Sequence, residues 1–537
     1  MRTAEISALV LWYATAAGAA PEWVGSQACA GCHAAIFQRY SQTPMATSSG
    51  LAGRSADAEK FDRASFSGSH APYDYSVRRE GGGYFLDVRK RDGSEPPFRR
   101  QLKYFVGSGL AARSYLIDVD GFLYEAPATY YRASGAWSFS PGYDAYAYPF
   151  LTRAIAPACL DCHASGVRAI KGTQNGFESP PFREGGVGCE RCHGPGGAHV
   201  RSAQAADIVN PAKLPAERRD SVCEQCHLAG EIRVDRAGRS QMDFVAGDGL
   251  SDYTVAFVAA GSSPRMKVTS HVENLAQSAC KRASGDRLWC GTCHDPHFVP
   301  AASERVAWFR SKCLTCHAAS DCKTPAALRA AKQDDCTACH MPRGGVSDAE
   351  HVVFTDHSIP RRPAPRTERA AADAPLKPFG TTTADARDLG LAYAIVAIRE
   401  QNAVYRARAF DLLREAENKS PGEPQTLSYL ADLYKGRSQD AEAARLFERL
   451  LAADPTQSSA PTSLGAYQME QGHYEEAVRL WKRALEISPS LVLVRLNLAV
   501  ALIRTGHGEE ARAVLEKALE FNPSFAAARK LLAEIPR

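Results

Sequence analysis

The chain has 537 residues, of which 45% are hydrophobic and 23% are charged, a composition typical of an ordinary globular protein with about two to four domains. The formal net charge of +4 is small and the basic residues form no stripe, which argues against a nucleic-acid partner. Sixteen cysteines are many for such a chain, and they could serve disulfides, zinc sites or haem attachment.

The first twenty residues are typical of an export signal. Arg2 gives a weakly basic start, residues 6–20 are apolar and small, and residues 17–19 (Ala-Gly-Ala) fit a signal-peptidase site, although Glu5 is unusual there. An uncleaved membrane anchor is the alternative. No other stretch is long and apolar enough to cross a bilayer, so we expect a periplasmic or otherwise exported protein with no transmembrane span after signal removal.

Fourteen of the sixteen cysteines lie in seven Cys-x-x-Cys-His motifs, the pattern of covalent haem c attachment. Two intervening residues put both sulfurs on one side of a turn, within reach of the two vinyl groups of one porphyrin edge, and the histidine can then bind the iron. Zinc is the alternative, but zinc sites do not require a histidine after every second cysteine. We therefore predict seven covalently attached haem c groups. Their predicted binding residues are Cys29, Cys32, His33, Cys159, Cys162, His163, Cys189, Cys192, His193, Cys223, Cys226, His227, Cys290, Cys293, His294, Cys313, Cys316, His317, Cys336, Cys339 and His340.

Between the first and second motifs, residues of about 65–150 contain no cysteine and are predicted to form a small antiparallel β insertion. Residues 84–89 alternate in polarity, and Asp120-Gly121 lies between two apolar runs as a hairpin signal. Residues 155–357 hold the other six motifs, and their weak helical periodicity favours short helices and loops around cofactors. Residues 359–389 are rich in proline, alanine and threonine and are interpreted as a linker.

From about residue 390 the sequence repeats every 34 residues, as proline, small and large apolar positions all show. The recurring residues are Pro421, Pro455, Pro489 and Pro523; Ala409, Ala443, Ala477 and Ala511; and Leu413, Phe447, Trp481 and Leu515. The small residues are expected where two helices touch, and the large ones fill the space between helices. This pattern predicts four helical repeats and a capping helix. Such arrays commonly bind peptides or proteins, although an array that only supports the rest of the chain is the alternative.

The histidines outside the motifs are too few to give every predicted iron a second histidine ligand. The six candidates for distal ligands are His70, His199, His271, His297, His351 and His357. His473 and His507 are excluded because they lie one repeat apart in turns of the helical array. At least one of the seven irons therefore has another ligand or an open position. Methionine sulfur is conceivable, from Met45, Met242, Met266 or Met341.

Because His297 lies only three residues after His294, we expect it to bind a neighbouring haem and not the haem of its own motif. His199 follows its motif through a glycine-rich loop, and the same argument applies to it. The two remaining cysteines, Cys280 and Cys322, either form a disulfide or stay free thiols.

These segments resemble the multihaem cytochrome c family typified by cytochrome c554, fused to tetratricopeptide repeats. The resemblance rests on residues 24–33, 189–196, 290–297 and 351–357, and on shorter stretches at 105–109 and 113–115. It implies covalent haem c, largely bis-histidine ligation, closely stacked haems and electron transfer in the periplasm. The chain differs from the four-haem family member in its haem number and its β insertion, so ligand pairing is not transferred haem by haem.

We accordingly predict a mainly α fold with a small β insertion, followed by an α-solenoid. Its parts are a signal peptide (1–20), a multihaem cytochrome c domain (21–358), a linker (359–389) and a tetratricopeptide-repeat domain (390–537). The favoured function is electron transfer between redox partner proteins, with a protein or peptide ligand of the repeats. The alternatives are a haem oxidoreductase that acts on a small nitrogen or sulfur compound at an open haem, and a repeat-based scaffold or redox sensor. The sequence names no catalytic residue.

Overall fold

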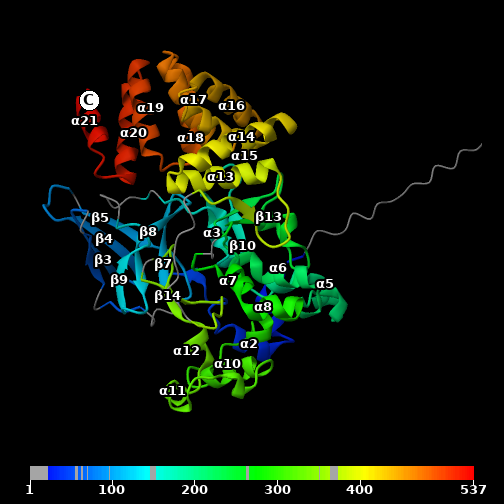
Figure 1. Ribbon diagram of the computed structural model, residues 1–537. Coiled ribbons are helices and arrows are strands. Elements are labelled where there is room, and N and C mark those ends of the chain that lie inside the picture. Colours follow the sequence, from blue (N-terminus) through cyan, green and yellow to red (C-terminus); the bar gives the residue numbers. More distant parts are fainter. Residues whose placement is uncertain are drawn as a thin grey trace, which may run out of the picture.

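Figure 1 shows the computed structural model, which describes residues 22–536 except 55–58, 62–63, 69–70, 96, 145–150, 152, 262–264, 350 and 363–372. The predicted export signal, His70 and residues 363–372 of the predicted linker lie outside the described residues. The rest of the chain forms two antiparallel sheets near the N-terminus, a central region of short helices and hairpins, and a C-terminal array of long helices.

The N-terminal part begins with two short helices and continues into two antiparallel sheets, with strand orders β2-β3-β4-β5 and β1-β6-β7-β8-β9. The elements are α1 (Ser26–Ala30), α2 (Ala34–Tyr40), β1 (Ser49–Leu51), β2 (Ser65–Ser67), β3 (Tyr73–Glu80), β4 (Gly83–Lys90), β5 (Phe98–Leu102), β6 (Tyr104–Val106), β7 (Ala112–Val119), β8 (Phe122–Tyr131) and β9 (Ala136–Phe139). Asp120 and Gly121, with φ of 53° and 85°, make the tight turn between β7 and β8.

The two sheets share one core that is rich in aromatic side chains. Tyr73, Tyr75 and Val77 are buried at alternating positions of β3, as expected of a strand that packs one face inward. Tyr115 of β7 has its ring centroid 6.0 Å from that of Tyr84 in β4 and 5.2 Å from that of Trp137 in β9. The two sheets therefore pack against each other around one shared core.

The prediction of a mainly α fold is wrong for the part of the chain that carries the motifs. Besides these two sheets, that part contains two hairpins and a three-stranded sheet of order β12-β13-β16. Part of the physical reason is that β1 pairs with β6 and β13 with β16, far along the chain, and such pairing leaves no local pattern. The helices between the cysteines are also too short to make the region helical.

The central region contains the last six motifs on short helices separated by hairpins. Its elements are α3 (Pro157–Asp161), β10 (Ala164–Ala169), β11 (Phe177–Gly185), α4 (Glu190–His193), α5 (Gly197–Ser202), α6 (Ala216–His227), β12 (Ile232–Asp235), β13 (Thr254–Ala259), α7 (His271–Gln277), α8 (Ala279–Ser284), α9 (Cys290–Cys293), α10 (Arg305–Leu314), α11 (Ala326–Ala330), α12 (Cys336–His340), β14 (Arg343–Gly345), β15 (Val353–Thr355) and β16 (Leu376–Pro378). Only α6 and α10 reach ten residues. The others depend on their surroundings, since isolated helices this short are unstable in water.

The C-terminal array consists of four antiparallel helix pairs and a last helix. The helices are α13 (Ala386–Glu400), α14 (Ala403–Lys419), α15 (Pro424–Lys435), α16 (Asp440–Ala453), α17 (Ser459–Glu470), α18 (Tyr474–Ile487), α19 (Val492–Arg504), α20 (Gly508–Phe521) and α21 (Ala526–Glu534). The recurring small residue allows close helix contact: a Cβ at Gly465 would lie 2.5 Å from Nε1 of Trp481. Trp481 itself is 1% exposed. The repeat in the sequence thus corresponds to the packing of the helices.

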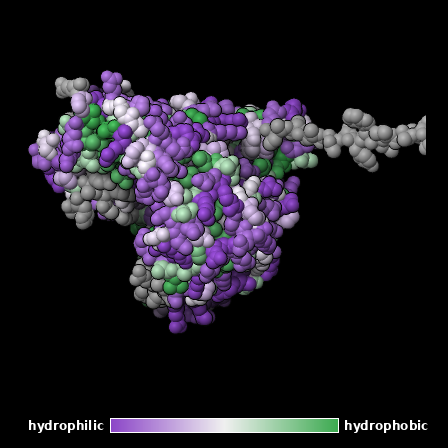
Figure 2. Space-filling model, turned by 90° about the horizontal axis from the view of Figure 1, so that it is seen from above, coloured by the Kyte–Doolittle hydropathy of each residue, from purple (hydrophilic) through white to green (hydrophobic). Residues whose placement is uncertain are grey.

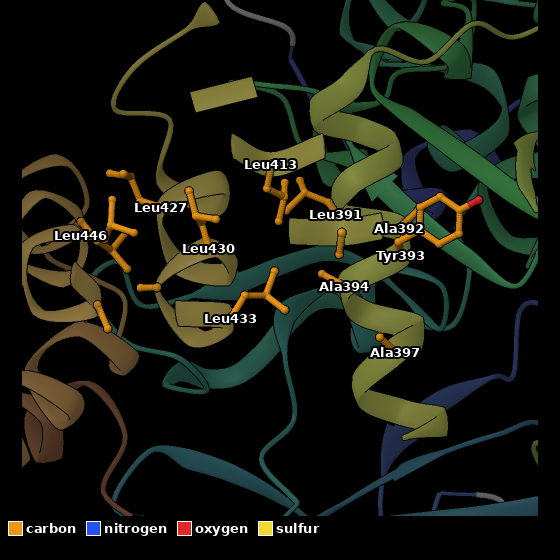
Figure 3. Packing of buried hydrophobic residues seen from close by; sticks show 14 of the residues in the cluster. Leu391, Ala392, Tyr393, Ala394, Ala397, Leu413, Leu427, Leu430, Leu433 and Leu446 are labelled. Carbon is orange, nitrogen blue, oxygen red and sulfur yellow. The ribbon is translucent and has the colours of Figure 1, made fainter. Parts of the chain in front are cut away.

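The array and the central region share hydrophobic core. Val255 and Phe257 of β13 and Leu376 of β16 belong to the same buried cluster as Leu391 and Leu413 of the first helix pair. Figure 3 shows Leu413, Leu427 and Leu430 of this cluster pointing into the space between the helices. The first helix pair is therefore packed onto the β12-β13-β16 sheet.

The other end of the array lies against the N-terminal sheets, as Figure 1 shows. Phe521 of α20 is part of the core of these sheets. Glu95, which follows β4, accepts hydrogen bonds from Ser524 and Arg529, at 2.8 and 3.1 Å. The array is thus fixed to the rest of the protein at both ends.

The surface seen from above the array is mostly hydrophilic, with hydrophobic residues in small scattered patches (Figure 2). Single exposed side chains such as Leu493 are common on soluble proteins. Among the helices of the described residues, none combines the length and the hydropathy that a membrane span requires.

Candidate functional site

Helical turns hold the first, third and fifth motifs. In these three, the backbone N–H of the motif histidine donates to the carbonyl of the first cysteine, at 2.9 Å for His33 and His294 and at 3.0 Å for His193; the N–H of His163 donates instead to the carbonyl of Leu160 at 2.9 Å. This bond holds the two thiols and the imidazole of a motif close together. The turn therefore has the local geometry that attachment of one porphyrin edge requires.

Three motif histidines each face a histidine that lies outside the motifs. The ring centroids are 6.2 Å apart for His33 and His199, 6.0 Å for His193 and His297, and 6.3 Å for His294 and His357. The two ring planes of each pair differ by 17°, 18° and 28°, respectively.

These separations match those of two axial ligands of one iron. Imidazole–metal bonds are about 2.0–2.1 Å long, so two histidines on opposite faces of one metal have ring centroids roughly 6 Å apart. His297 faces the histidine of another motif and not His294, its neighbour in sequence. His199 likewise faces the first motif and not its own.

The fourth pair of histidines is closer than an iron would allow. Nδ1 of His227 lies 3.3 Å from Nδ1 of His271, and the ring centroids are 5.0 Å apart at an interplanar angle of 86°. The ring of His271 also lies 4.7 Å from that of His357. His227 and His271 are therefore neighbours, but their rings are not arranged as two axial ligands of one metal.

Backbone carbonyls orient four of the histidine rings. Nδ1 of His193 lies 2.8 Å from the carbonyl oxygen of Val209, and Nδ1 of His357 lies 2.9 Å from that of Thr355. His199 and His340 make the same kind of contact, at 2.9 and 3.1 Å. Because a carbonyl only accepts, Nδ1 carries the proton and Nε2 has a free lone pair, as a metal-binding imidazole requires.

Burial keeps several of these rings neutral. It lowers the pKa of His227 to about 4 and that of His271 to about 2, with nearby histidines adding to the effect. The pKa of His163 is lowered by burial alone. Neutral imidazole is the form that binds metals, so the rings are in the required state at neutral pH.

Three motif histidines have no histidine partner among the described residues. These are His163, His317 and His340. Of the other predicted distal ligands, His351 packs its ring against Tyr131, with centroids 5.2 Å apart, and His70 lies outside the described residues. His163 differs from the other two because its Nδ1 is buried without a hydrogen-bond partner.

Thiols of different motifs also approach one another. Cys29 interacts with Cys189, Cys162 with Cys226, Cys223 with Cys290, and Cys313 with Cys336. Burial, followed by the neighbouring thiols, raises the pKa of Cys29 to about 11 and that of Cys313 to about 11. The motifs therefore lie in neighbouring positions through the central region. Cys280 and Cys322 are both free thiols.

The segment with the last three motifs has almost no hydrophobic core of its own. Among the described residues of 265–349, no hydrophobic side chain except Pro300 is fully buried. Leu314, inside the sixth motif, is 37% exposed, and Leu328 is 62% exposed. A group of large apolar porphyrins would fill this segment, so the residues present fit haem. By contrast, no three of the described His, Cys, Asp or Glu side chains converge as a metal-ion site, so the zinc alternative has no preformed site there.

The residues that connect the motifs are not among those predicted from the sequence. Asp161 and Arg191, both placed between the cysteines of their motifs, form an ion pair of 2.9 Å. Glu190 accepts hydrogen bonds from the backbone N–H groups of Val24, Gly25 and Gly196 at 2.7–2.9 Å. The signal that could have identified them is the presence of charged residues between the two cysteines of a motif. His473 and His507, which were excluded as ligands, bond to side chains of their own turns.

Comparisons with known proteins agree with the motifs and the repeats. Residues 147–194 match the family described as cytochrome c554 and c-prime, and residues 430–492 and 468–535 match tetratricopeptide repeat families. The multiheme cytochrome MtrA of Shewanella baltica (strain OS185) is 28% identical over 215 residues, which are 38% of this chain and 57% of that protein. The chain thus spans little more than half the length of this relative. The resemblance to cytochrome c554-like multihaem cytochromes and to tetratricopeptide repeats is confirmed.

Two solved structures each match about a quarter of the chain. A crystal structure of MamA is 17% identical, with a TM-score of 0.24, over 26% of this chain and 80% of that one. A crystal structure of YrrB, described as a TPR protein with an unusual peptide-binding site, is 18% identical, with a TM-score of 0.25, over 27% of this chain and 75% of that one.

Proposed function

We propose that this chain is an exported c-type cytochrome that carries seven covalently attached haems and transfers electrons between protein partners. Its cytochrome domain (21–358) holds the haems, and its repeat domain (390–537) docks one partner. The observation that carries the proposal concerns three motif histidines. Each of them faces a histidine outside the motifs, at the separation expected of two axial ligands of one iron. The match of residues 147–194, which include the second and third motifs, supports it.

When bound, haem c supplies an iron that takes up and releases single electrons. The chain's own residues do the rest. The two cysteines of each motif fix the porphyrin edge, and the carbonyls of Val209 and Thr355 orient His193 and His357. Thiol contacts between motifs support close haem spacing, which electron transfer along the chain requires.

The mass of the exported protein tests this proposal. Under denaturing conditions we expect the mass of the mature polypeptide plus seven haems, with the first twenty residues removed. A mass well short of seven haems would contradict the cofactor assignment. An unprocessed N-terminus would contradict the export signal.

A haem oxidoreductase acting on a small nitrogen or sulfur compound is the second candidate, and the environment of His163 favours it. His163 is partly buried and faces no histidine among the described residues, so an iron bound there would have no second histidine ligand from these residues. Electron paramagnetic resonance of the oxidised protein tests this candidate. A high-spin signal that is lost on adding cyanide or nitrite is expected of an open haem; a fully low-spin spectrum that neither anion changes would exclude it.

A further inference from the structure

Three of the motifs are locked together by residues that lie between their cysteines. Nη2 of Arg191, in the third motif, donates to Oδ2 of Asp161, in the second motif, at 2.9 Å. Nε2 of Gln225, in the fourth motif, donates to the carbonyl of Arg191 at 3.2 Å. Sγ of Cys162 lies 3.9 Å from the carbonyl of Gln225. The second, third and fourth motifs thus form one hydrogen-bonded hub.

Arg233 of β12 holds the fourth motif in this hub. Its Nη1 donates to the carbonyls of Glu224, Gln225 and Leu228, at 3.3, 2.8 and 3.3 Å. These carbonyls lie at the end of α6, where the carbonyl of Glu224 also accepts from the backbone N–H of Leu228 and the helix leaves the other two without a partner of its own. The guanidinium therefore caps the helix that carries Cys223, Cys226 and His227.

The rest of the guanidinium is buried without hydrogen bonds. Nε and Nη2 of Arg233 have no partner among the described residues. The thiols of Cys162 and Cys226 and the carboxyls of Asp235 and Glu224 are close enough to interact with it electrostatically. Neither carboxyl accepts a hydrogen bond from these two nitrogens, and Asp161 is paired with Arg191. Arginine stays protonated in proteins, so a positive charge lies between the second and fourth motifs.

We propose that Arg233 positions the fourth motif and raises the reduction potentials of the haems held by the second and fourth motifs. This inference rests on the proposed haem attachment. Reduction adds an electron to a haem, so a nearby positive charge stabilises the reduced form. The charge acts strongly here because it is buried and poorly screened by water.

Redox titration of the full-length holoprotein, followed by haem absorbance, tests the proposal. In Arg233→Gln we expect two of the seven midpoint potentials to shift to lower values while the others stay unchanged. Arg233→Lys keeps the charge and should keep both potentials near those of the parent protein. Arg239→Gln is the matched control, since it removes the same charge from an exposed side chain just after β12, and it should shift none.

An unchanged titration of Arg233→Gln with all haems present would overturn the proposal, as would a shift of equal size in Arg233→Lys. Peptide mass mapping covers the case in which Arg233→Gln loses haem. Selective loss from Cys223 and Cys226 would support the positioning role, and loss from distant motifs alone would contradict it. Absence of covalent haem from the parent protein would instead refute the proposed function.

Discussion

The helical array and the segment of residues 265–349 show two different ways of holding a fold together. In the array, Trp481, Leu498 and Leu515 are at most 1% exposed and pack between helices. In residues 265–349, no hydrophobic side chain but Pro300 is fully buried among those described, although the segment contains three motifs. The array therefore supplies its own core, whereas the motif segment needs one from its cofactors.

Because of this difference, the two regions should respond differently to the loss of haem. Each burial of a large side chain in the array contributes a few kcal/mol, and the contributions are spread over many residues. In the motif segment, the same role falls on a few large groups attached through cysteine. Loss of haem should then affect one region and spare the other.

The largest effect is expected when the protein is made without haem attachment. The segment 265–349 should lose its fold, because nothing else excludes water from it, while α14 to α20 should stay folded. Amide hydrogen exchange of the haem-free chain measures this, with near-complete exchange expected in the segment and strong protection in the array. Protection of α9, α10 and α12 without haem would contradict the comparison.

Truncation of Trp481 tests whether the array is stabilised by its own hydrophobic core. Trp481→Ala should destabilise the array by about 3–5 kcal/mol, because it leaves a large cavity against Gly465 and removes the indole hydrogen bond to Thr462. Denaturant unfolding followed by circular dichroism gives the value. The haem absorbance should not change before the array unfolds. Leu493→Ala, at a side chain that is 65% exposed, should cost no more than about 0.5 kcal/mol.

Glu95 tests the contact between the N-terminal sheets and the array. Burial raises the pKa of its carboxyl, but hydrogen bonds from Lys90, Ser524, Tyr73 and Arg529 outweigh this and lower the pKa to about 2. A glutamate in an unfolded chain has a pKa of about 4.3, so the stabilisation is complete above that pH and is lost as the pH falls towards 2.

Glu95→Gln should lower the free energy of unfolding by about 1–3 kcal/mol at pH 7, since it breaks charge-assisted hydrogen bonds. The difference from the parent protein should shrink at pH 3, as unfolding curves at both pH values would show. Glu80→Gln is the control on the same sheet, because Glu80 is exposed and pairs with Arg99 of a neighbouring strand region, not with the helical array. An equal loss at both pH values would contradict this assignment.

The smallest change is expected from removing one distal histidine. In His297→Ala, the haem of the third motif should turn from low-spin to high-spin while the protein keeps its full haem mass and its fold. Electron paramagnetic resonance measures the conversion of one centre in seven. His473→Ala, in a turn of the array, should leave the spectrum as it is. A high-spin haem at the fifth motif would show that His297 serves its own motif.

The sequence predicted the parts of this protein whose signals are local or periodic. The seven motifs are recognisable because five residues contain the whole pattern, and the array is recognisable because Ala443, Ala477 and Ala511 recur at a fixed step. Counting histidines also predicts that at least one iron has another ligand or an open position.

The features that the sequence did not reveal depend on contacts between distant segments. The sheets are held by pairs such as Leu51 with Tyr104, which leave no repeating pattern in the chain. His297 faces His193 across about a hundred residues, and Arg233 reaches the end of α6 from a separate strand. Spacing alone cannot show which residues meet in this way.

A structure of the exported holoprotein at a resolution that shows axial ligands is the most direct test of the central claim. We expect one iron between His33 and His199, one between His193 and His297, and one between His294 and His357. Three such irons would establish that the described arrangement is that of a multihaem cytochrome. An iron of the first, third or fifth motif with a different histidine opposite would contradict it.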